Sequence, residues 1–452
     1  MLLAKPSIVG KVVLAVLAIS ATIFQCGASF ASSEQREYDI VVFGATGLLG
    51  SLGSASLVGA HDMYLSVPKT ALLSTGVGRA KIALAARNLA KLQALKDRFA
   101  ATCSPNLCAY IDRVELIVAD LSDEASLDAF VRKTKVVVNF AGPSWDSMDD
   151  AASLARTTLT PGLLSMKCAL AGTHYVDVSV NLTPWFTKER DAVDGTSLGP
   201  TLSILDAVAR TTGAVISPST GCISVPHELT AWLAADALGG GRGSLPRRIS
   251  SYEVAYSKVA KGEMLRKDGS NAFPWNMMYD EELDQSVQML GAIPVQQSLM
   301  EVLAKPSMEL LADQMGWDNV SYQQFSPTNQ WYSHFEYIRH DDGDIDFLRN
   351  ARLCVVTEVE AMDGRIQTVS MQQFEGIYEE ASRESIEMAL ALVFQKDQVP
   401  ASSTGGVMMA ASGWGHSLVR NLVAIGNNVT VETPGKGAAP VLARLMRTYG
   451  ML

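Results

Sequence analysis

Residues 38–50 read YDIVVFGATGLLG, an apolar run that ends in three glycines spaced three residues apart. The run predicts a buried strand and the glycines open a helix, which is the arrangement that binds the pyrophosphate of a dinucleotide. The first glycine allows a tight turn, the second lets the backbone approach the phosphates, and the third lets the helix pack on the strand. The N-terminus of that helix also attracts an anion. We therefore expect cofactor contacts at Gly44, Ala45, Thr46, Gly47, Leu48 and Gly50.

Short β-rich runs alternate with helical segments up to residue 219, which is the pattern of βαβ units around a parallel sheet. Six strands with helices between them predict a doubly wound, Rossmann-type α/β domain over residues 36–237. The expected strands are residues 38–44, 81–87, 114–120, 135–142, 174–179 and 213–219, and the expected helices lie within 88–100, 123–133, 149–171 and 188–212.

The second expected strand ends in Arg87-Asn88, where an NAD-binding domain carries an Asp or Glu against the ribose 2′-hydroxyl. An arginine suits a 2′-phosphate, so this pair favours NADP. About 37 residues separate Gly50 from Arg87, and the usual spacing is roughly 20. We attribute the excess to a surface insertion at residues 59–79. Two alternatives stay open: an ordinary strand-to-helix turn at the glycines, and a surface arginine at Arg87.

Two further strand ends complete the expected cofactor site. Asp120-Leu121 follow the third strand and NFAGP (139–143) follows the fourth, so both lie on the carboxyl edge where such sheets bind ligands. We expect Asp120-Leu121 to meet the adenine, and Ala141-Gly142 to pass beneath the nicotinamide ribose. Each pair also has an ordinary interpretation as a helix cap or a turn.

A glycine-rich break at residues 238–248 predicts a domain boundary. The sequence beyond it predicts a second, α+β domain over residues 248–376, which we expect to bind substrate or to form a homodimer, followed by a C-terminal helical segment at 377–452. The expected strands are residues 248–259, 331–339, 351–361 and 365–376, and the expected helices lie near 280–315, 381–395 and 440–450.

Residues 1–33 have the three parts of a secretory signal: Lys5 and Lys11, an apolar run from Val12 to Phe24, and the small residues of CGASFASS. The apolar run is short for a membrane span, but an uncleaved anchor stays an alternative. A second alternative is the first half of a two-part plastid address. We expect the secretory pathway or an organelle reached through it, the endoplasmic reticulum or a complex plastid, with membrane association left open.

The composition excludes several classes of protein. The net charge is −10, and Lys and Arg are not clustered, which argues against a nucleic-acid surface. Cys26 lies in the signal segment, and the five cysteines after it cannot all pair, so the chain has no disulfide framework. Cys103 and Cys108, in CSPNLC, can form one local bridge in an oxidising compartment or stay two free thiols.

No metal is expected from the histidines or from the acidic stretch RHDDGDIDF (339–347). That stretch lacks the ligand spacing of a calcium loop and is typical of a solvated turn. His334, His340 and His416 have no Cys or His partners at zinc spacing.

Several motifs occur together in the order found in one family: IVVFGATGLLG, LAARNLAKLQAL, VVNFAGP, GTHYVDVS, SPSTGCISVPHEL, FEGIYEEASRESIEMALAL and GGVMMAASGWGHSLVRNL. In these motifs the chain resembles the saccharopine dehydrogenase-like oxidoreductases, a group that includes the trans-acting enoyl reductases. The sequence departs from the family at Val180-Asn181, where a Gly-Glu pair is usual, and at Cys222-Ile223, within a Gly-Phe-Asp-Ser-x-Pro pattern. Two carboxylates near the expected reaction site are therefore missing.

The acid/base chemistry is less well marked than the cofactor site. No Tyr-x-x-x-Lys occurs in the sequence, so the proton-transfer pair of short-chain dehydrogenases is absent. Tyr175 and Asp177 are weak candidates for catalysis, since alternate residues of a strand share a face. Packing and helix capping are the ordinary roles of both residues.

The resemblance implies an NADP-dependent oxidoreductase that reduces an enoyl or imine-type double bond on a small-molecule or lipid-linked, hydrophobic substrate. Such a hydride transfer relies mainly on positioning, with one proton donor or water completing it. The alternative is a catalytically impaired nucleotide-binding scaffold at a membrane or lipid surface, which the two missing carboxylates would permit.

Overall fold

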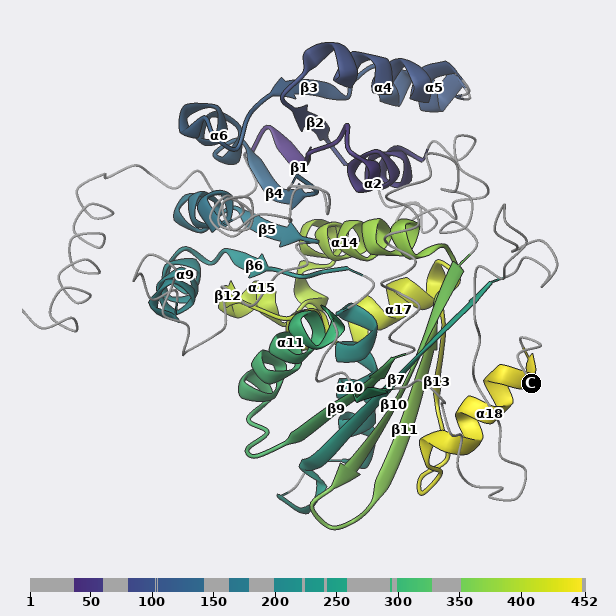
Figure 1. The fold of residues 1–452 in the computed structure, drawn as a ribbon. Coiled ribbons are helices and arrows are strands. Elements are labelled where there is room, and N and C mark those ends of the chain that lie inside the picture. Colours follow the sequence, from purple (N-terminus) through teal and green to yellow (C-terminus); the bar gives the residue numbers. More distant parts are fainter. Residues whose placement is uncertain are drawn as a thin grey trace, which may run out of the picture.

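The computed structural model describes residues 36–59, 80–101, 103, 105–141, 162–178, 199–221, 224–239, 242–257, 293–294, 299–326 and 351–448. These residues form two β-sheets with helices packed on them, and helix α14 (Ile377–Phe394) lies between the sheets (Figure 1). An α/β domain with a second, α+β domain was expected, and the structure confirms this fold class.

The first sheet has seven parallel strands in the order β12-β6-β5-β4-β1-β2-β3. The chain runs from β1 outward through β2 to β3, and then returns to the other side of β1 to form β4. This reversal is where doubly wound sheets bind ligands. The strands are β1 (Tyr38–Phe43), β2 (Ile82–Ala86), β3 (Glu115–Val118), β4 (Thr134–Asn139), β5 (His174–Asp177), β6 (Val215–Ser217) and β12 (Gly406–Val407).

Helices cover both faces of this sheet, which explains why its central strands are apolar at nearly every position. In β1, Ile40 and Val42 pack with one group of helices, while Val41 and Phe43 pack with the other. The first group is α2 (Leu48–Val58), α4 (Leu89–Ala101), α5 (Pro105–Ile111) and α14, and the second is α6 (Glu124–Val131), residues 162–171 and α9 (Gly199–Thr212).

The second sheet is mixed, with strand order β13-β11-β10-β7-β9-β8, in which β7 and β9 are parallel and the other neighbours are antiparallel. Helices α10 (Val225–Leu238) and α11 (Leu299–Met315) pack on one face, and α18 (Ala438–Thr448) covers Cys354 and Val356 on the other. The strands are β7 (Pro246–Ser257), β8 (Ile293–Pro294), β9 (Ser321–Ser326), β10 (Ala351–Ala361), β11 (Ile366–Gln372) and β13 (Asn428–Val431).

The C-terminal segment was expected to be helical, but it also supplies a strand to each sheet. β12 pairs with β6 in the first sheet and β13 pairs with β11 in the second. Both strands are too short to carry a hydrophobic period, so the sequence pattern could not reveal them. The remaining short elements are η4 (Arg242–Ser244), η7 (Lys396–Gln398), α15 (Ala401–Thr404), α16 (Ala410–Trp414) and α17 (His416–Ala424).

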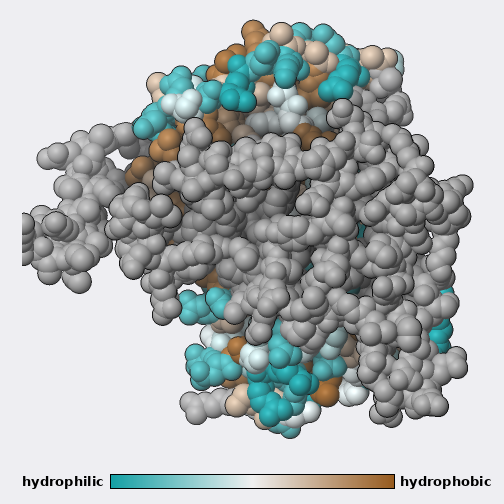
Figure 2. Space-filling view, in the orientation of Figure 1, coloured by the Kyte–Doolittle hydropathy of each residue, from teal (hydrophilic) through white to brown (hydrophobic). Residues whose placement is uncertain are grey.

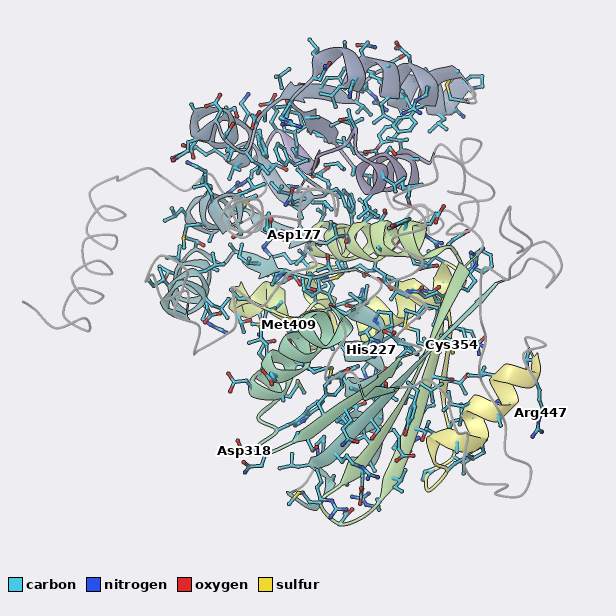
Figure 3. All side chains as sticks on the ribbon, in the orientation of Figure 1. Asp177, His227, Asp318, Cys354, Met409 and Arg447 are labelled. Atoms are coloured by element: carbon cyan, nitrogen blue, oxygen red, sulfur yellow. A yellow bond between two sulfur atoms is a disulfide. The ribbon has the colours of Figure 1, made fainter. Side chains whose placement is uncertain are left out.

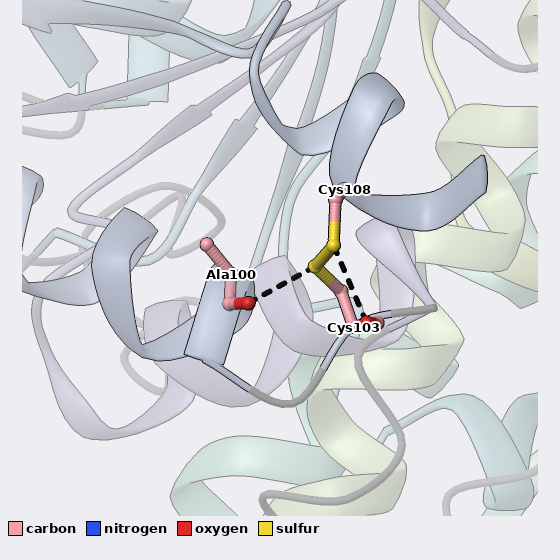
Figure 4. The surroundings of a disulfide bond; sticks show 3 residues. All are labelled: Ala100, Cys103 and Cys108. Carbon is pink, nitrogen blue, oxygen red and sulfur yellow. Dashed lines mark hydrogen bonds between the residues drawn. A yellow bond between two sulfur atoms is a disulfide. The ribbon is translucent and has the colours of Figure 1, made fainter. Parts of the chain in front are cut away.

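Cys103 and Cys108 form a disulfide that joins the end of α4 to the first turn of α5 (Figure 4). Their Cα atoms are 5.3 Å apart, and the Cys103 sulfur lies 3.0 Å from the carbonyl oxygen of Ala100. Of the two states that the sequence left open, the structure has the bridge. Cys168 and Cys354 are buried free thiols.

The surface near the β3 edge of the first sheet shows hydrophilic and hydrophobic residues side by side (Figure 2). Val118 of β3 and Leu89, the first residue of α4, are about half exposed. Within the described ranges, no helix has the length and apolar character needed to cross a membrane. The expected signal at 1–33, most of the insertion at 59–79 and the strand expected at 331–339 lie outside the described residues.

Candidate functional site

The glycine-rich loop after β1 is closed on one side by the segment that follows β4. Gly44 has a φ of 79°, in the left-handed region that favours glycine. A Cβ atom at Gly44 would lie 2.5 Å from the amide nitrogen of Ala141, and one at Gly50 would collide with the carbonyl group of Gly44. The turn role of the first glycine and the packing role of the third therefore have a direct steric basis.

Gly47 differs from its two partners because packing does not require a glycine there. A Cβ atom at Gly47 would meet, among the described residues, the Gly44 carbonyl oxygen at 3.4 Å and no other atom within 4 Å. The space beside this backbone is what a loop needs if phosphate groups are to approach it. The role expected of Gly47 toward a pyrophosphate stays a prediction.

Helix α2 begins at this loop without a side-chain cap. Gly47 is its N-cap residue, with φ −77° and ψ 175°, and no side chain hydrogen-bonds to the cap position. The first N–H groups of a helix have no partner within the helix, and the peptide dipoles place partial positive charge there. This terminus, flanked by half-buried Thr46 and exposed Leu48, is thus suited to an anion.

Arg87 and Asn88 follow β2, the strand next to β1, and have different surroundings. Oδ1 of Asn88 accepts a hydrogen bond from the backbone N–H of Lys91 at 3.0 Å, so Asn88 caps α4. The Arg87 guanidinium is exposed at the sheet edge, where an anionic ligand can reach it. The cap interpretation therefore explains Asn88, while Arg87 remains suited to a 2′-phosphate.

Asp120 lies at the end of β3, the neighbouring strand. Its Oδ1 accepts hydrogen bonds from the backbone N–H and the hydroxyl of Ser122, at 2.9 and 2.8 Å. These bonds, and to a smaller extent the positive charge of Arg87, lower the pKa of the Asp120 carboxyl. Leu121 is half-buried against the apolar cluster beneath α6. The role of Asp120 in a turn explains the hydrogen bonds of its Oδ1. A contact between Asp120 and the adenine stays a prediction.

Tyr175 and Asp177 do share a face of β5, and their side chains are in contact. The Tyr175 hydroxyl donates to Oδ2 of Asp177 at 2.5 Å, and Nδ2 of Asn139 donates to the Tyr175 oxygen at 3.0 Å. Burial, and then the charge of Asp177, raises the pKa of Tyr175 well above its usual value. Figure 3 places Asp177 where β5 ends beside α14. Tyr175 therefore stays protonated, and its hydroxyl group donates to Asp177.

Helix α14 packs against the first sheet, where it contacts β1, β4 and β5, and against α2. Ser382 donates a hydrogen bond to the carbonyl oxygen of Leu49, in the first turn of α2, at 3.1 Å. The hydroxyls of Ser385 and Thr220, which follows β6, are 2.9 Å apart. Ile386 packs near Gly53 of α2. The C-terminal segment thus completes the surroundings of the expected cofactor loop.

The first half of α14 buries several charged side chains, which is uncommon for Glu and Arg. Glu380, Glu384 and Arg383 are at most 2% exposed. Burial, and then the charge of Glu380, raises the pKa of Glu384 well above its usual value. Burial also raises the pKa of Glu375, just before the helix, to about 7, although the positive charge of Arg383 opposes the shift.

A second buried polar cluster, which the sequence analysis missed, lies between α10 and the second sheet. Nδ1 of His227 is 2.6 Å from the Ser251 hydroxyl, and its Nε2 is 2.7 Å from Oε1 of Glu253. The Ser251 hydroxyl is also 2.8 Å from that of Thr357. No single residue in the pattern PHEL signals such a cluster, because β7 and β10 supply its partners.

Among the described residues, no group of three or more His, Cys, Asp or Glu side chains is placed to hold a metal ion. His416 pairs with Asp236 and packs edge-on against the ring of Trp232. Several sequence expectations fall outside the described residues, namely those on Gly142, Val180-Asn181, Cys222-Ile223, His334, His340 and the stretch 339–347.

Two groups of known proteins resemble the chain. It is 30% identical over 198 residues to a trans-acting enoyl reductase of Mycobacterium ulcerans, covering 44% of this chain and 35% of that protein. It is 29% identical over 215 residues to a trans-acting enoyl reductase of Mycobacterium tuberculosis, covering 47% and 40%. The matches thus span less than half the length of these relatives. The resemblance that the motifs indicated is confirmed.

Solved structures resemble the chain at lower identity. The apo saccharopine dehydrogenase (L-Glu forming) of Saccharomyces cerevisiae is 12% identical, with a TM-score of 0.47, over 88% of this chain and 100% of that one. The Citrobacter triphenylmethane reductase complexed with NADP(H) is 16% identical, with a TM-score of 0.25, over 49% and 60%. No protein-family model matches the chain.

Proposed function

We propose that this chain is an NADP-dependent oxidoreductase that reduces an enoyl or imine-type double bond on a hydrophobic or lipid-linked substrate. The observation that carries the proposal is the geometry of the loop between β1 and α2. Gly44 and Gly50 are fixed by packing, and they hold the uncapped N-terminus of α2 at the point where the strand order reverses. An ordinary strand-to-helix turn requires none of these features together.

The residues at this edge fit a phosphorylated dinucleotide. The backbone at Gly47 and the first turn of α2 can receive the pyrophosphate, and the exposed guanidinium of Arg87 can pair with a 2′-phosphate. An NAD-binding domain carries a carboxylate at that position to accept the 2′-hydroxyl, and Arg87 cannot accept a hydrogen bond. The cofactor preference that follows is NADP over NAD.

When bound, a reduced nicotinamide dinucleotide supplies a hydride to the double bond. The residues of this chain bind and orient the reactants, which is the larger part of catalysis for such a transfer. The second requirement is a proton at the neighbouring atom of the substrate. Because the Tyr175 hydroxyl already donates its hydrogen bond to Asp177, water is the proton donor that this arrangement favours.

The substrate class rests on the relatives, which are named enoyl reductases. Reduction of an enoyl group converts C=C to CH–CH and consumes one hydride and one proton.

The test is consumption of NADPH by the purified chain, followed by its absorbance, with enoyl thioesters of increasing chain length and with lipid quinones. We expect turnover with at least one enoyl thioester, faster with NADPH than with NADH. Arg87→Asp serves as the matched control, because it should remove the preference for NADPH. Saturable NADPH binding without turnover on the whole panel would instead favour the nucleotide-binding scaffold.

The compartment that we propose is the endoplasmic reticulum lumen or an organelle reached through it. The Cys103–Cys108 disulfide supports this placement, since disulfides persist in oxidising compartments. The proposal also needs a pool of pyridine nucleotide in that compartment. Fractionation of cells that express the tagged full chain tests it, and recovery in the cytosolic fraction with free Cys103 and Cys108 would contradict it.

A further inference from the structure

Three side chains and one peptide group form a directional chain of hydrogen bonds at the ends of β4 and β5. The Ala141 N–H donates to Oδ1 of Asn139 at 3.0 Å. Nδ2 of Asn139 donates to the Tyr175 oxygen at 3.0 Å, and the Tyr175 hydroxyl donates to Asp177 at 2.5 Å. Asn139 and Tyr175 are fully buried and Asp177 is 2% exposed. The chain therefore runs from a loop peptide to a buried carboxylate.

The neighbours of Asn139 fix the orientation of its amide. The side that faces the Ala141 N–H must be the carbonyl oxygen, because an amino group there would oppose another donor. The amino group then faces Tyr175, with Oδ2 of Asp177 at 3.4 Å. Asn139 accepts at one end and donates at the other, which an ionised Asp, a Leu or an Ala cannot do in the same space.

We propose that Asn139 is a positioning residue for the cofactor: it ties the Ala141 peptide, which lies against Gly44 of the glycine loop, to the buried Tyr175–Asp177 pair. This inference rests on the proposed function and deepens it, since Asn139 is not among the expected cofactor contacts. A Cβ atom added at Gly44 would lie only 2.5 Å from the Ala141 nitrogen, so a shift of Ala141 changes the loop directly.

The physical reason is the high cost of breaking one link in a buried chain. An unpaired buried donor or acceptor costs about 1–3 kcal/mol, and more when a charged group loses its partner. Linked hydrogen bonds also polarise one another in a low-dielectric interior. Loss of the Asn139 amino group would therefore weaken the hydrogen bond from Ala141 as well as the one to Tyr175.

An Asn139→Asp variant tests the chain because its effect must depend on pH. The new carboxylate still accepts from Ala141, but it faces Tyr175 and Asp177 with one hydroxyl proton for two acceptors. Like charges in a buried site raise the pKa of one carboxyl above the ordinary value of about 4. The protonated form of residue 139 then donates to Tyr175 as the amide did.

Among the described residues, the other titratable groups near this pair include Cys168, on the helix at 162–171, Arg36 beside it, and His174 of β5. Burial raises the pKa of the Cys168 thiol and lowers that of His174 to about 4, so both groups stay uncharged over the range used in the test. Helix α14 packs on β4 and β5 and carries Glu384, whose pKa burial raises well above its usual value. Because each variant is referred to the wild type at the same pH, titration of these native groups cancels from the comparison.

We would measure NADP⁺ binding by titration calorimetry at about pH 8 and about pH 5.5, with each variant referred to the wild type at the same pH. Asn139→Asp should bind about tenfold more weakly at the higher pH and within about twofold of the wild type at the lower one. Asn139→Ala should bind NADP⁺ about tenfold more weakly than the wild type at both pH values. Asn428→Asp, an exposed site on β13, is the matched control and should follow the wild type.

Thermal unfolding supplies a readout without the cofactor. The loss in Tm of Asn139→Asp relative to the wild type should shrink on acidification, while that of Asn139→Ala should not. Failure of the wild type to bind NADP⁺ would remove the proposed function, and the unfolding data would still test the chain. The inference would be overturned if Asn139→Asp lost the same affinity for NADP⁺ at both pH values, or if Asn139→Ala bound NADP⁺ as tightly as the wild type. If Asn139→Asp does not fold at the higher pH, Tyr175→Phe breaks the chain at its centre, and wild-type affinity there would overturn it.

Discussion

The ring of Phe140 packs directly on Gly53: a Cβ atom at Gly53 would lie 2.7 Å from Cε2 of the ring. Gly53 is on α2, and Phe140 is the residue before Ala141, which closes the glycine loop. On the same side of Gly53, Ile386 of α14 would lie 3.6 Å from such a Cβ atom. Three segments far apart in the sequence thus meet at one glycine beneath the expected cofactor site.

Gly53→Ala should destabilise the protein by about 1–2 kcal/mol, because the half-buried Phe140 ring must move to admit a methyl group. Gly47→Ala is the matched control, since that site has room, and it should leave the free energy of unfolding within about 1 kcal/mol of the wild type. Urea unfolding of both variants checks this. If the two variants lost the same free energy of unfolding, packing would not distinguish Gly53 from Gly47.

Arg87→Asp should weaken binding of NADPH far more than binding of NADH, by about tenfold or more in the ratio of dissociation constants. The reason is that the substitution replaces the proposed partner of the 2′-phosphate with a repulsive carboxylate. Fluorescence titration measures both affinities. Arg113→Asp, exposed at the opposite end of β3, should leave the ratio unchanged. If Arg87→Asp weakens binding of NADPH and NADH by the same factor, the assignment of Arg87 to the 2′-phosphate is wrong.

Removing the disulfide with Cys103→Ser and Cys108→Ser together should cost about 2 kcal/mol of unfolding free energy, the value expected for so short a loop. The expected effect is on stability, and NADPH affinity should change little, since the bridge lies at the C-terminal end of α4, the opposite end from Arg87. Denaturant unfolding with and without reductant checks the double variant against the wild type. Ready labelling of Cys103 and Cys108 in the oxidised, folded protein would contradict the bridge.

Glu375→Gln should make the stability of the protein less dependent on pH. The pKa of Glu375 in the folded state is raised to about 7, by burial first, with Arg383 opposing the shift. A raised carboxyl pKa means that the wild type loses stability as pH rises from about 4.5 through about 7. Glu375→Gln should therefore be the more stable protein at about pH 8, by of the order of 1 kcal/mol once solvent screening is allowed for, and should show no gain near about pH 4.5.

The control for this prediction is Glu309→Gln, an exposed glutamate on α11. Thermal unfolding across the pH range should show no pH-dependent difference between Glu309→Gln and the wild type. A difference for Glu375→Gln that is constant with pH would mean that Glu375 titrates like an ordinary carboxyl.

The first sheet could be predicted well because its central strands are buried on both faces. Runs such as Ile40–Phe43 are apolar throughout, and Gly44 marks where β1 ends. The shared face of Tyr175 and Asp177 also followed from the two-residue period of a strand. These are local properties, so a single sequence shows them.

Other features depend on which strands pair and could not be predicted. Asn139 lies beside Asp177 because β4 and β5 pair in that register, and nothing in VVNFAGP indicates the partner. β9 reads SYQQFS, a mostly polar strand that lacks a clear alternation. The charges at the start of α14 are typical of a solvated helix, but the helix is buried between two sheets, so tertiary packing overrides the local pattern.

The most direct test of the central claim is the affinity of the purified full chain for NADPH and NADH, measured by fluorescence titration under the same conditions. We expect saturable binding of NADPH, about tenfold or more tighter than that of NADH, and a loss of that preference in Arg87→Asp. No saturable binding of either dinucleotide by the folded protein would contradict the claim that the loop from Gly44 to Gly50 holds a cofactor.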